Sequence, residues 1–323
     1  MTPIELRFSS PKGRSSSEYD LVIAGAGPAG LTGAIYGARF GLKTLVAERL
    51  APGGQIATAD LVENYPGFPE GISGARLGEL MEAQARRFGA EIIQDGIASV
   101  KREGDLFRLS AESGAELVAR AVIASTGAEP KRLGIPGEDE FIGRGVSYCA
   151  VCDGMLFREK TVAVIGGGDS ALSEARYLSS LAGKVYLIHR RAEFRAQNYL
   201  VNEVRNLGNV EFLTPYVPVE IKGENRVRAI VLENRETHEN KEIALDGIFV
   251  YVGLVPNSQP FLELVDADEN GFIITDAHMR TRTPGLFAAG DVRAKPLRQV
   301  STAVGDGALA AQSAYEFLKE QKG

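Results

Sequence analysis

Apolar runs alternate along the chain with glycine-rich turns and helix-like stretches, and this pattern is typical of an α/β fold. One arrangement occurs twice. The first copy has a strand, a glycine turn, a helix and a second strand over residues 20–24, 25–30, 31–40 and 42–47. The second copy has the same elements over residues 161–165, 166–171, 172–178 and 184–188. Each copy is a βαβ unit of about thirty residues, so we predict two Rossmann-like nucleotide-binding domains.

Further strand-like runs lie between and after these units, over Leu106–Leu109, Leu117–Ala124 and Leu286–Ala289, and a helix is predicted over Ala303–Lys319. The domain boundaries are predicted close to Gly127 and Leu254, so that the second domain is inserted within the first. The resulting organisation is a flexible N-terminal tail, a discontinuous first domain and an inserted second domain, over residues 1–18, 19–127 with 255–323, and 128–254.

The first glycine turn has the spacing of a pyrophosphate-binding loop. Gly25 permits a tight turn, Gly27 lets the backbone approach a ligand, and Gly30 allows the helix to pack close to the strand. Free N–H groups at the helix start can then hold an anion. Glu48 ends the next strand, where a carboxylate can accept hydrogen bonds from ribose hydroxyls and would repel a ribose phosphate. The first site therefore favours FAD or NAD over NADP.

The second unit carries the opposite charge at the matching place. Arg190 and Arg191 follow the strand and Arg195 comes shortly after. Guanidinium groups pair well with a phosphate dianion, which favours NADPH over NADH, although a solvated basic surface is the alternative. Two dinucleotide sites can exchange a hydride. Spacing alone does not assign the cofactors, but charge favours FAD in the first unit and NADPH in the second.

The chain has two cysteines, Cys149 and Cys152, separated by two residues. A structural zinc site needs four ligands, and the three histidines lack zinc-finger spacing, so we predict no metal. A purely structural disulfide between such near neighbours would gain little stability. A redox-active pair is favoured, in which one thiolate attacks a partner disulfide and the second thiol resolves the mixed disulfide. Asp153 is the candidate acid for the accompanying proton, with a turn or cap residue as the alternative.

Composition narrows the classes of protein. The net charge of −6 argues against a general nucleic-acid binder. Only two cysteines, together with no recognisable signal peptide, favour a reducing cytoplasm. The uncharged stretch over Leu21–Ala38 approaches the length of a membrane span, but Pro28 and five glycines favour a strand, a turn and a helix instead. We therefore expect no membrane segment.

The motif Cys149-Ala150-Val151-Cys152-Asp153-Gly154 closely resembles the redox motif of low-molecular-weight thioredoxin reductases. The resemblance extends from about Tyr19 to Leu318. Its other markers are the two glycine turns, Gly53-Gly54-Gln55, Glu63-Asn64-Tyr65-Pro66-Gly67, His189-Arg190-Arg191, Ala289-Gly290-Asp291-Val292 and Arg298-Gln299-Val300.

The resemblance implies an FAD- and NADPH-dependent homodimeric enzyme that reduces thioredoxin or a thioredoxin-like protein. It implies that Cys149 attacks the partner, that Cys152 faces the flavin, and that Asp153 transfers the proton. The implied FAD site comprises Gly25, Gly27, Pro28, Ala29, Gly30, Glu48, Gly54, Gln55, Asn64, Thr126, Gly127, Gly290, Asp291, Arg298, Gln299 and Val300. The implied NADPH site comprises Gly166, Gly168, Asp169, Ser170, His189, Arg190, Arg191 and Arg195.

The sequence departs from the family pattern at Leu254, where some relatives have a histidine, so we assign that position no proton-transfer role. Two other hypotheses stay open. The same architecture could use another electron donor, such as reduced ferredoxin, or another partner. A non-catalytic flavin-binding sensor is the remaining alternative, and turnover of NADPH with a disulfide partner would separate it from an enzyme.

Overall fold

The computed structural model describes residues 17–59 and 61–321, so residues 1–16 of the predicted tail, which comprised residues 1–18, lie outside the described part. The chain divides into two compact units. The first comprises Met1–Thr58, Gly74–Gly127 and Pro256–Gly323, and the second comprises Ala59–Ser73 and Ala128–Val255. The segment Ala59–Ser73, which the sequence analysis placed in the first domain, is thus grouped with the second unit.

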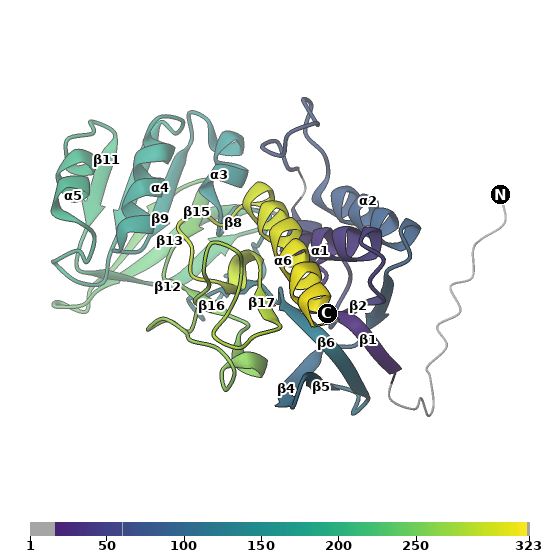
Figure 1. The fold of residues 1–323 in the computed structure, drawn as a ribbon. Coiled ribbons are helices and arrows are strands. Elements are labelled where there is room, and N and C mark those ends of the chain that lie inside the picture. Colours follow the sequence, from purple (N-terminus) through teal and green to yellow (C-terminus); the bar gives the residue numbers. More distant parts are fainter. Residues whose placement is uncertain (1–16, 60, 322–323) are drawn as a thin grey trace. The chain divides into compact units, whose positions relative to one another are not determined.

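A seven-stranded sheet forms the centre of the first unit (Figure 1). Its strand order is β3-β2-β1-β6-β5-β4, and β17 pairs with β6. The bounds are β1 Ser17–Ala24, β2 Thr44–Glu48, β3 Glu91–Gln94, β4 Ile97–Glu103, β5 Leu106–Ala111, β6 Glu116–Ala124 and β17 Leu286–Ala288. Strands β1, β2, β3, β6 and β17 are parallel, and β4 and β5 are antiparallel additions. Their Val, Ile, Leu and Ala side chains form the buried core.

Small residues let the helices of the first unit pack closely together. Its helices are α1 Pro28–Arg39, α2 Gly74–Arg87 and α6 Val300–Glu320, with short 3-10 turns η1 Gly54–Thr58, η3 Gln259–Phe261 and η4 Gly290–Val292. Helix α1 packs against α6 and α2. At Gly307 of α6, an added Cβ would collide with the carbonyl oxygen of Ala29, so α6 can pass the start of α1 only with a glycine there.

The second unit contains a five-stranded parallel sheet in the order β11-β10-β9-β15-β8. Its strands are β8 Val146–Ser147, β9 Thr161–Ile165, β10 Lys184–Ile188, β11 Val210–Leu213 and β15 Gly247–Val250. A three-stranded antiparallel sheet and a two-stranded sheet are formed by β12 Tyr216–Gly223, β13 Val227–Asn234 and β14 Asn240–Ala244, and by β7 Ala128–Pro130 and β16 Leu254–Pro256. The helices are α3 Ala150–Asp153, α4 Asp169–Ser179 and α5 Asn198–Arg205, with the 3-10 turn η2 Gly154–Phe157.

The predicted α/β fold with two Rossmann-like domains is confirmed. Some limits differ. Strand β1 begins at Ser17, so Ser17 and Glu18 lie in a strand paired with β6 and not in the predicted tail. Helix α6 begins at Val300, three residues before the predicted start, because Gln299 and Thr302 form a capping box. The uncharged stretch over Leu21–Ala38 is divided between β1 and α1, and no helix within the described residues is long and apolar enough to cross a membrane.

Candidate functional sites

The first candidate site lies at one edge of the large sheet, where its parallel strands end. Strands β1, β2, β6 and β17 point the same way, so the residues that follow them share this edge. These residues are the glycine turn after β1, Glu48 at the end of β2, Thr126 and Gly127 after β6, and Gly290 and Asp291 after β17. Parallel topology therefore brings together residues that are up to 266 positions apart, from Gly25 to Asp291.

The glycine turn after β1 leaves room for a ligand. Gly25 has a φ of +103°, which only glycine adopts readily. At Gly30 an added Cβ would collide with the carbonyl oxygen of Gly25, whereas at Gly27 it would meet no atom within 4 Å. Because Pro28 occupies the first helical position, Ala29 and Gly30 supply the next two N–H groups of α1. The turn is thus closed on its protein side and open at Gly27, as a pyrophosphate-binding turn requires.

Glu48 is attached to the backbone of this edge through both carboxylate oxygens. Oε2 accepts a hydrogen bond from the Ala26 N–H at 2.6 Å, and Oε1 accepts one from the Leu50 N–H at 3.0 Å. A carboxylate has about four acceptor positions, so two remain for ribose hydroxyls. Glu48 therefore shapes the turn and can still bind a nucleotide.

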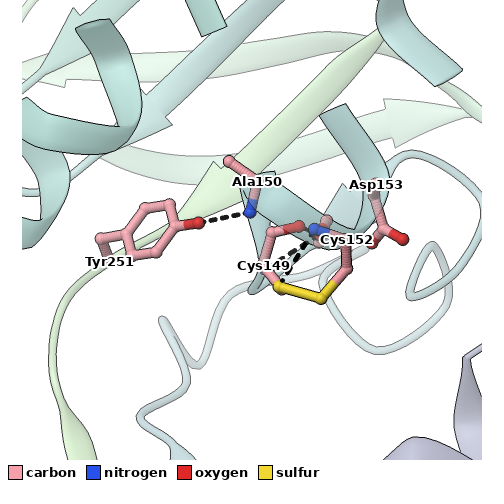
Figure 2. The surroundings of a disulfide bond; sticks show 6 residues. Cys149, Ala150, Cys152, Asp153 and Tyr251 are labelled. Carbon is pink, nitrogen blue, oxygen red and sulfur yellow. Dashed lines mark hydrogen bonds between the residues drawn. A yellow bond between two sulfur atoms is a disulfide. The ribbon is translucent and has the colours of Figure 1, made fainter. Parts of the chain in front are cut away.

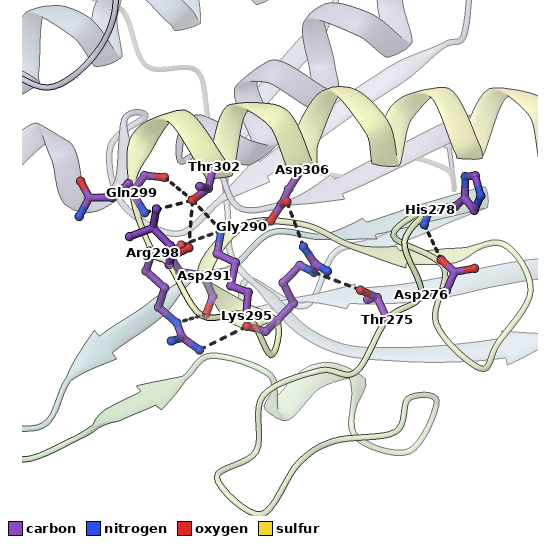
Figure 3. A network of polar contacts seen from close by, with 12 residues as sticks. Thr275, Asp276, His278, Gly290, Asp291, Lys295, Arg298, Gln299, Thr302 and Asp306 are labelled. Carbon is purple, nitrogen blue, oxygen red and sulfur yellow. Dashed lines mark hydrogen bonds and ion pairs between the residues drawn. The ribbon is translucent and has the colours of Figure 1, made fainter. Parts of the chain in front are cut away.

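A network of ionic contacts surrounds Asp291 (Figure 3). Lys295 Nζ lies 3.2 Å from Asp291 Oδ1, but without hydrogen-bond geometry, and 3.1 Å from Asp306 Oδ2. Asp306 also accepts from the Gly290 N–H at 3.1 Å and pairs with Arg293 at 3.0 Å. Burial raises the pKa of the Asp291 carboxyl, although the nearby Lys295 ammonium opposes this shift. Asp291 Oδ1 is thus buried beside the Lys295 ammonium, while the side chain as a whole is 36% exposed and can still accept a hydrogen bond from a ligand hydroxyl.

Arg298 lies beside this network. Its guanidinium group lies 4.1 Å from the ring centroid of Phe272, and it donates to the carbonyl oxygens of Asp291 and Arg293. Burial lowers the pKa of Arg298, while Asp291 opposes the shift. The group nevertheless stays charged at neutral pH.

The other residues predicted for the FAD site occupy several places. Gly54 and Gln55 begin η1, and an added Cβ at Gly54 would come within 3.0 Å of the Gly27 Cα. Thr126 donates to the Asn257 carbonyl at 2.6 Å, and Gln299 caps α6 immediately before Val300. Asn64 belongs to the segment grouped with the second unit, where residues 63–69 line a hollow of about 360 Å³. Asn64 therefore belongs to the other unit, and its role in the FAD site stays a prediction.

The second candidate site lies at the corresponding edge of the five-stranded sheet. Strands β8, β9, β10 and β15 are parallel, so the residues that follow them share an edge. Cys149 comes after β8, Gly166 after β9, His189 after β10 and Tyr251 after β15. The redox cysteines and the second glycine turn thus lie along the same sheet edge, with the end of β15 between them, and 17 positions separate Cys149 from Gly166 in the sequence.

The second glycine turn is packed against the basic loop. An added Cβ at Gly167 would collide with the His189 ring, while at Gly168 it would meet no atom within 4 Å. The Arg195 N–H donates to the Gly167 carbonyl at 2.8 Å, and Asp169 accepts from the Gln197 N–H at 2.8 Å. Ser170 occupies the second position of α4. These contacts hold the loop over residues 190–197 beside the start of α4.

The charged side chains of this loop are exposed. Arg190, Arg191 and Arg195 all lie at the surface, and within residues 17–59 and 61–321 none of them forms an ion pair with a carboxylate. Their partner can therefore be a ligand phosphate. His189 is buried against Phe194, and burial lowers the pKa of its ring, with the neighbouring arginines adding to the shift. His189 is consequently neutral at neutral pH and fills space beside the turn.

Cys149 and Cys152 form a disulfide across the short helix α3 (Figure 2). Cys149 is the N-cap, and its Sγ accepts from the Cys152 N–H at 3.2 Å. The Ala150 N–H donates to the Tyr251 hydroxyl at 2.5 Å. Both cysteines are only partly buried, and Val151 beside them is exposed. Both residues of the disulfide are thus partly exposed, and the backbone of the turn is fixed by the Tyr251 hydroxyl.

Several residues of these sites were missed by the sequence analysis. Lys295 and Asp306 organise the surroundings of Asp291, and Ser147 and Tyr251 contact the disulfide turn. A signal existed for Asp306, since a carboxylate within the small-residue stretch Val304–Ala308 is unusual. Tyr251 had no such signal, because it lies 101 positions from Ala150.

Known proteins resemble this chain over most of its length. The sequence matches the family described as "Pyridine nucleotide-disulphide oxidoreductase" over residues 19–307. The chain therefore belongs to the pyridine nucleotide-disulphide oxidoreductase family.

Several thioredoxin reductases are similar to this chain in sequence and in structure. The thioredoxin reductase of Bacillus subtilis is 46% identical over 303 residues, covering 94% of this chain and 95% of the relative. That of Listeria innocua is also 46% identical, with the same coverage. The crystal structure of thioredoxin reductase from Streptococcus pyogenes superposes with a TM-score of 0.88 at 44% identity, covering 95% of this chain and 100% of that one. The resemblance to thioredoxin reductases is confirmed, and the chain is an oxidoreductase.

Proposed function

We propose that this protein is an NADPH-dependent thioredoxin reductase that acts through FAD and the Cys149–Cys152 disulfide. The carrying observation is that a partly exposed disulfide and a glycine turn with an arginine-rich loop share one sheet edge. A phosphate-selective nucleotide site and an accessible redox pair are the two features that such an enzyme needs in this unit. The activity of the relatives supports thioredoxin as the partner.

The residues of the first edge fit FAD. The turn is open at Gly27, Glu48 keeps free acceptor positions, and the Asp291 side chain is 36% exposed. When bound, FAD would supply the electron transfer between the nicotinamide and the disulfide. In the second unit, Gly168 leaves space for a pyrophosphate at the start of α4, and Arg190 and Arg191 would hold a 2′-phosphate.

The cysteines then carry out thiol–disulfide exchange. The Cys149 thiolate attacks one sulfur of the thioredoxin disulfide, and the other thioredoxin sulfur leaves as a thiolate. The Cys152 thiolate attacks Cys149 Sγ in the resulting mixed disulfide. This step restores the Cys149–Cys152 bond and releases, as a thiolate, the thioredoxin sulfur that was bound to Cys149. Asp153 exchanges the proton that accompanies opening and closing of the disulfide. A homodimer located in the cytoplasm completes the proposal, and sedimentation of the purified protein tests the dimer.

One anaerobic experiment tests the route. The purified protein should carry a flavin spectrum, bleach with NADPH, and oxidise NADPH in the presence of thioredoxin. We expect Cys149→Ser to lower thioredoxin reduction by about three orders of magnitude or more while flavin reduction persists.

Cys152→Ser is the matched variant, because it keeps the nucleophile and removes the resolving thiol. It should accumulate a covalent adduct with thioredoxin, and Cys149→Ser should not. Undiminished thioredoxin reduction by Cys149→Ser would contradict the assigned nucleophile. Activity with reduced ferredoxin but not with NADPH would instead favour the alternative electron donor.

A further inference from the structure

A buried serine connects the candidate proton donor to the candidate nucleophile. Ser147 ends β8 and is 6% exposed. Its Oγ lies 2.6 Å from Asp153 Oδ2, to which it donates, and accepts a hydrogen bond from the Cys149 N–H at 3.1 Å. The Cys149 carbonyl oxygen lies 3.3 Å from the same Oγ. A hydroxyl has one proton to donate. The Asp153 carboxylate oxygen is nearer than the Cys149 carbonyl oxygen and is the stronger acceptor, so the Ser147 hydroxyl donates to Asp153.

Two other titratable groups face the disulfide turn from neighbouring elements. Tyr251 follows β15, and Glu174 lies on α4, which packs against α3. Burial raises the pKa of Tyr251, and the charges of Glu174 and Asp153 add to this shift. Burial also raises the pKa of Glu174. Tyr251 is therefore neutral at neutral pH, and its hydroxyl oxygen accepts a hydrogen bond from the Ala150 N–H. The hydroxyl that donates to Asp153 is that of Ser147, at the end of β8.

We propose that Ser147 is a positioning residue that holds the Asp153 carboxylate for proton transfer to the redox pair. The inference rests on the proposed function, in which Asp153 is the acid. Bound FAD would supply two electrons that reduce the Cys149–Cys152 bond, which would leave two sulfur anions. A proton from Asp153 converts one anion to a thiol and leaves a carboxylate. The Ser147 hydroxyl stabilises that carboxylate, while the Cys149 N–H fixes the position of Ser147 Oγ.

The test is the pH profile of thioredoxin reduction under single-turnover conditions with the flavin-loaded protein. Ser147→Ala removes a donor from the carboxylate, which favours the protonated acid. We expect a lower plateau and a falling limb displaced upward by about one pH unit, a tenfold change in the protonation ratio. Ser147→Thr keeps the hydroxyl and should retain the parent limb. Asp153→Asn should abolish the limb with either residue at position 147.

Ser313→Ala is the matched control. Ser313 is 1% exposed and donates to the His278 carbonyl at 2.7 Å in the other unit, so its loss affects stability without reaching the disulfide turn. Ser313→Ala should leave the falling limb of the pH profile at the parent's pH. An unmoved limb in Ser147→Ala, or equal displacement in Ser147→Thr, would overturn the proposal. Failure of the parent to reduce thioredoxin, with flavin reduction by NADPH intact, would instead refute the proposed partner. In that case, the same profiles measured with a small aromatic disulfide still decide the role of Ser147.

Discussion

The two glycine turns follow the same topology, but the charged residues beside them are held in different ways. Glu48 is bonded through both oxygens to backbone N–H groups and helps to shape the first turn. Arg190 and Arg191 belong to a loop whose backbone is fixed by the contacts of Arg195 and Asp169, while their guanidinium groups stay exposed. The comparison teaches that one carboxylate can both stabilise a turn and bind a ligand. Within the described part of the chain, the arginines that would bind a phosphate make no such contacts, because other residues hold the backbone of their loop.

Within the comparison of the two turns, the largest expected effect tests the basic loop. The double substitution Arg190→Ala/Arg191→Ala should lower kcat/KM for NADPH by about 100-fold, since two charge-assisted hydrogen bonds are lost at about tenfold or more each. The value for NADH should change by less than about threefold. Arg176→Ala is the control, because Arg176 is an exposed cation in the same unit that pairs with Glu203 at 2.9 Å. Steady-state kinetics with both nucleotides provide the measurement, and a parallel loss for NADH would break the comparison.

The next effect tests the acid of the first turn. In Glu48→Gln the amide nitrogen cannot accept a hydrogen bond, so either the Ala26 or the Leu50 N–H loses its acceptor. We expect the Kd for FAD to rise about tenfold in a fluorescence titration of the apoprotein. Glu103→Gln changes an exposed carboxylate of the same unit that pairs with Arg108 at 2.9 Å, and it should bind FAD normally. Unchanged FAD affinity in Glu48→Gln would show that this acid has no role in the site.

An effect on stability of similar size concerns the redox turn, which only the second edge carries. Tyr251→Phe removes the acceptor of the buried Ala150 N–H and should lower the free energy of unfolding by about 1–3 kcal/mol. Denaturant unfolding measures this loss. Tyr36→Phe is the control because Tyr36 is an exposed tyrosine. Equal stabilities of the Tyr251 and Tyr36 variants would indicate that another acceptor, such as water, replaces the hydroxyl.

The smallest effect concerns Asp291 in the apoprotein. Because burial raises its pKa, the folded state binds this proton more tightly than the unfolded state. The group therefore favours folding at acid pH, and this contribution is lost as the pH rises through the folded-state value. Asp291→Asn should stabilise the apoprotein at pH 8 by less than about 1 kcal/mol, because the side chain is 36% exposed and solvent screens it.

The stability difference between Asp291→Asn and the parent should narrow as the pH falls from 8 through the raised folded-state pKa of Asp291, as thermal unfolding would report. Asp306→Asn should have the opposite sign, because it weakens the contacts with Gly290, Arg293 and Lys295 together. A destabilised Asp291→Asn apoprotein at pH 8 would show that the Lys295 ion pair outweighs burial.

Much of the fold could be predicted because the relevant signals are local. Apolar runs with adjacent glycine turns located β1, β9 and the helices that follow them, since strand and turn preferences depend on nearby residues. The start of α6 was misplaced because a capping box of Gln299 and Thr302 lacks the usual residue types. Asp306 and Tyr251 were missed because their partners lie far away in the sequence, and no local pattern reports such a contact.

The sequence by itself determined two Rossmann-like units, the opposite charges of their turns, and the close pair of cysteines. These features follow from backbone preferences, side-chain charge and short spacing. Only the tertiary structure decided that the disulfide shares an edge with the second turn, that Ser147 bridges Asp153 and Cys149, and that Lys295 lies between two carboxylates. The physical reason is that parallel strand order and helix packing set these neighbours, and both depend on the burial of apolar surface across the whole chain.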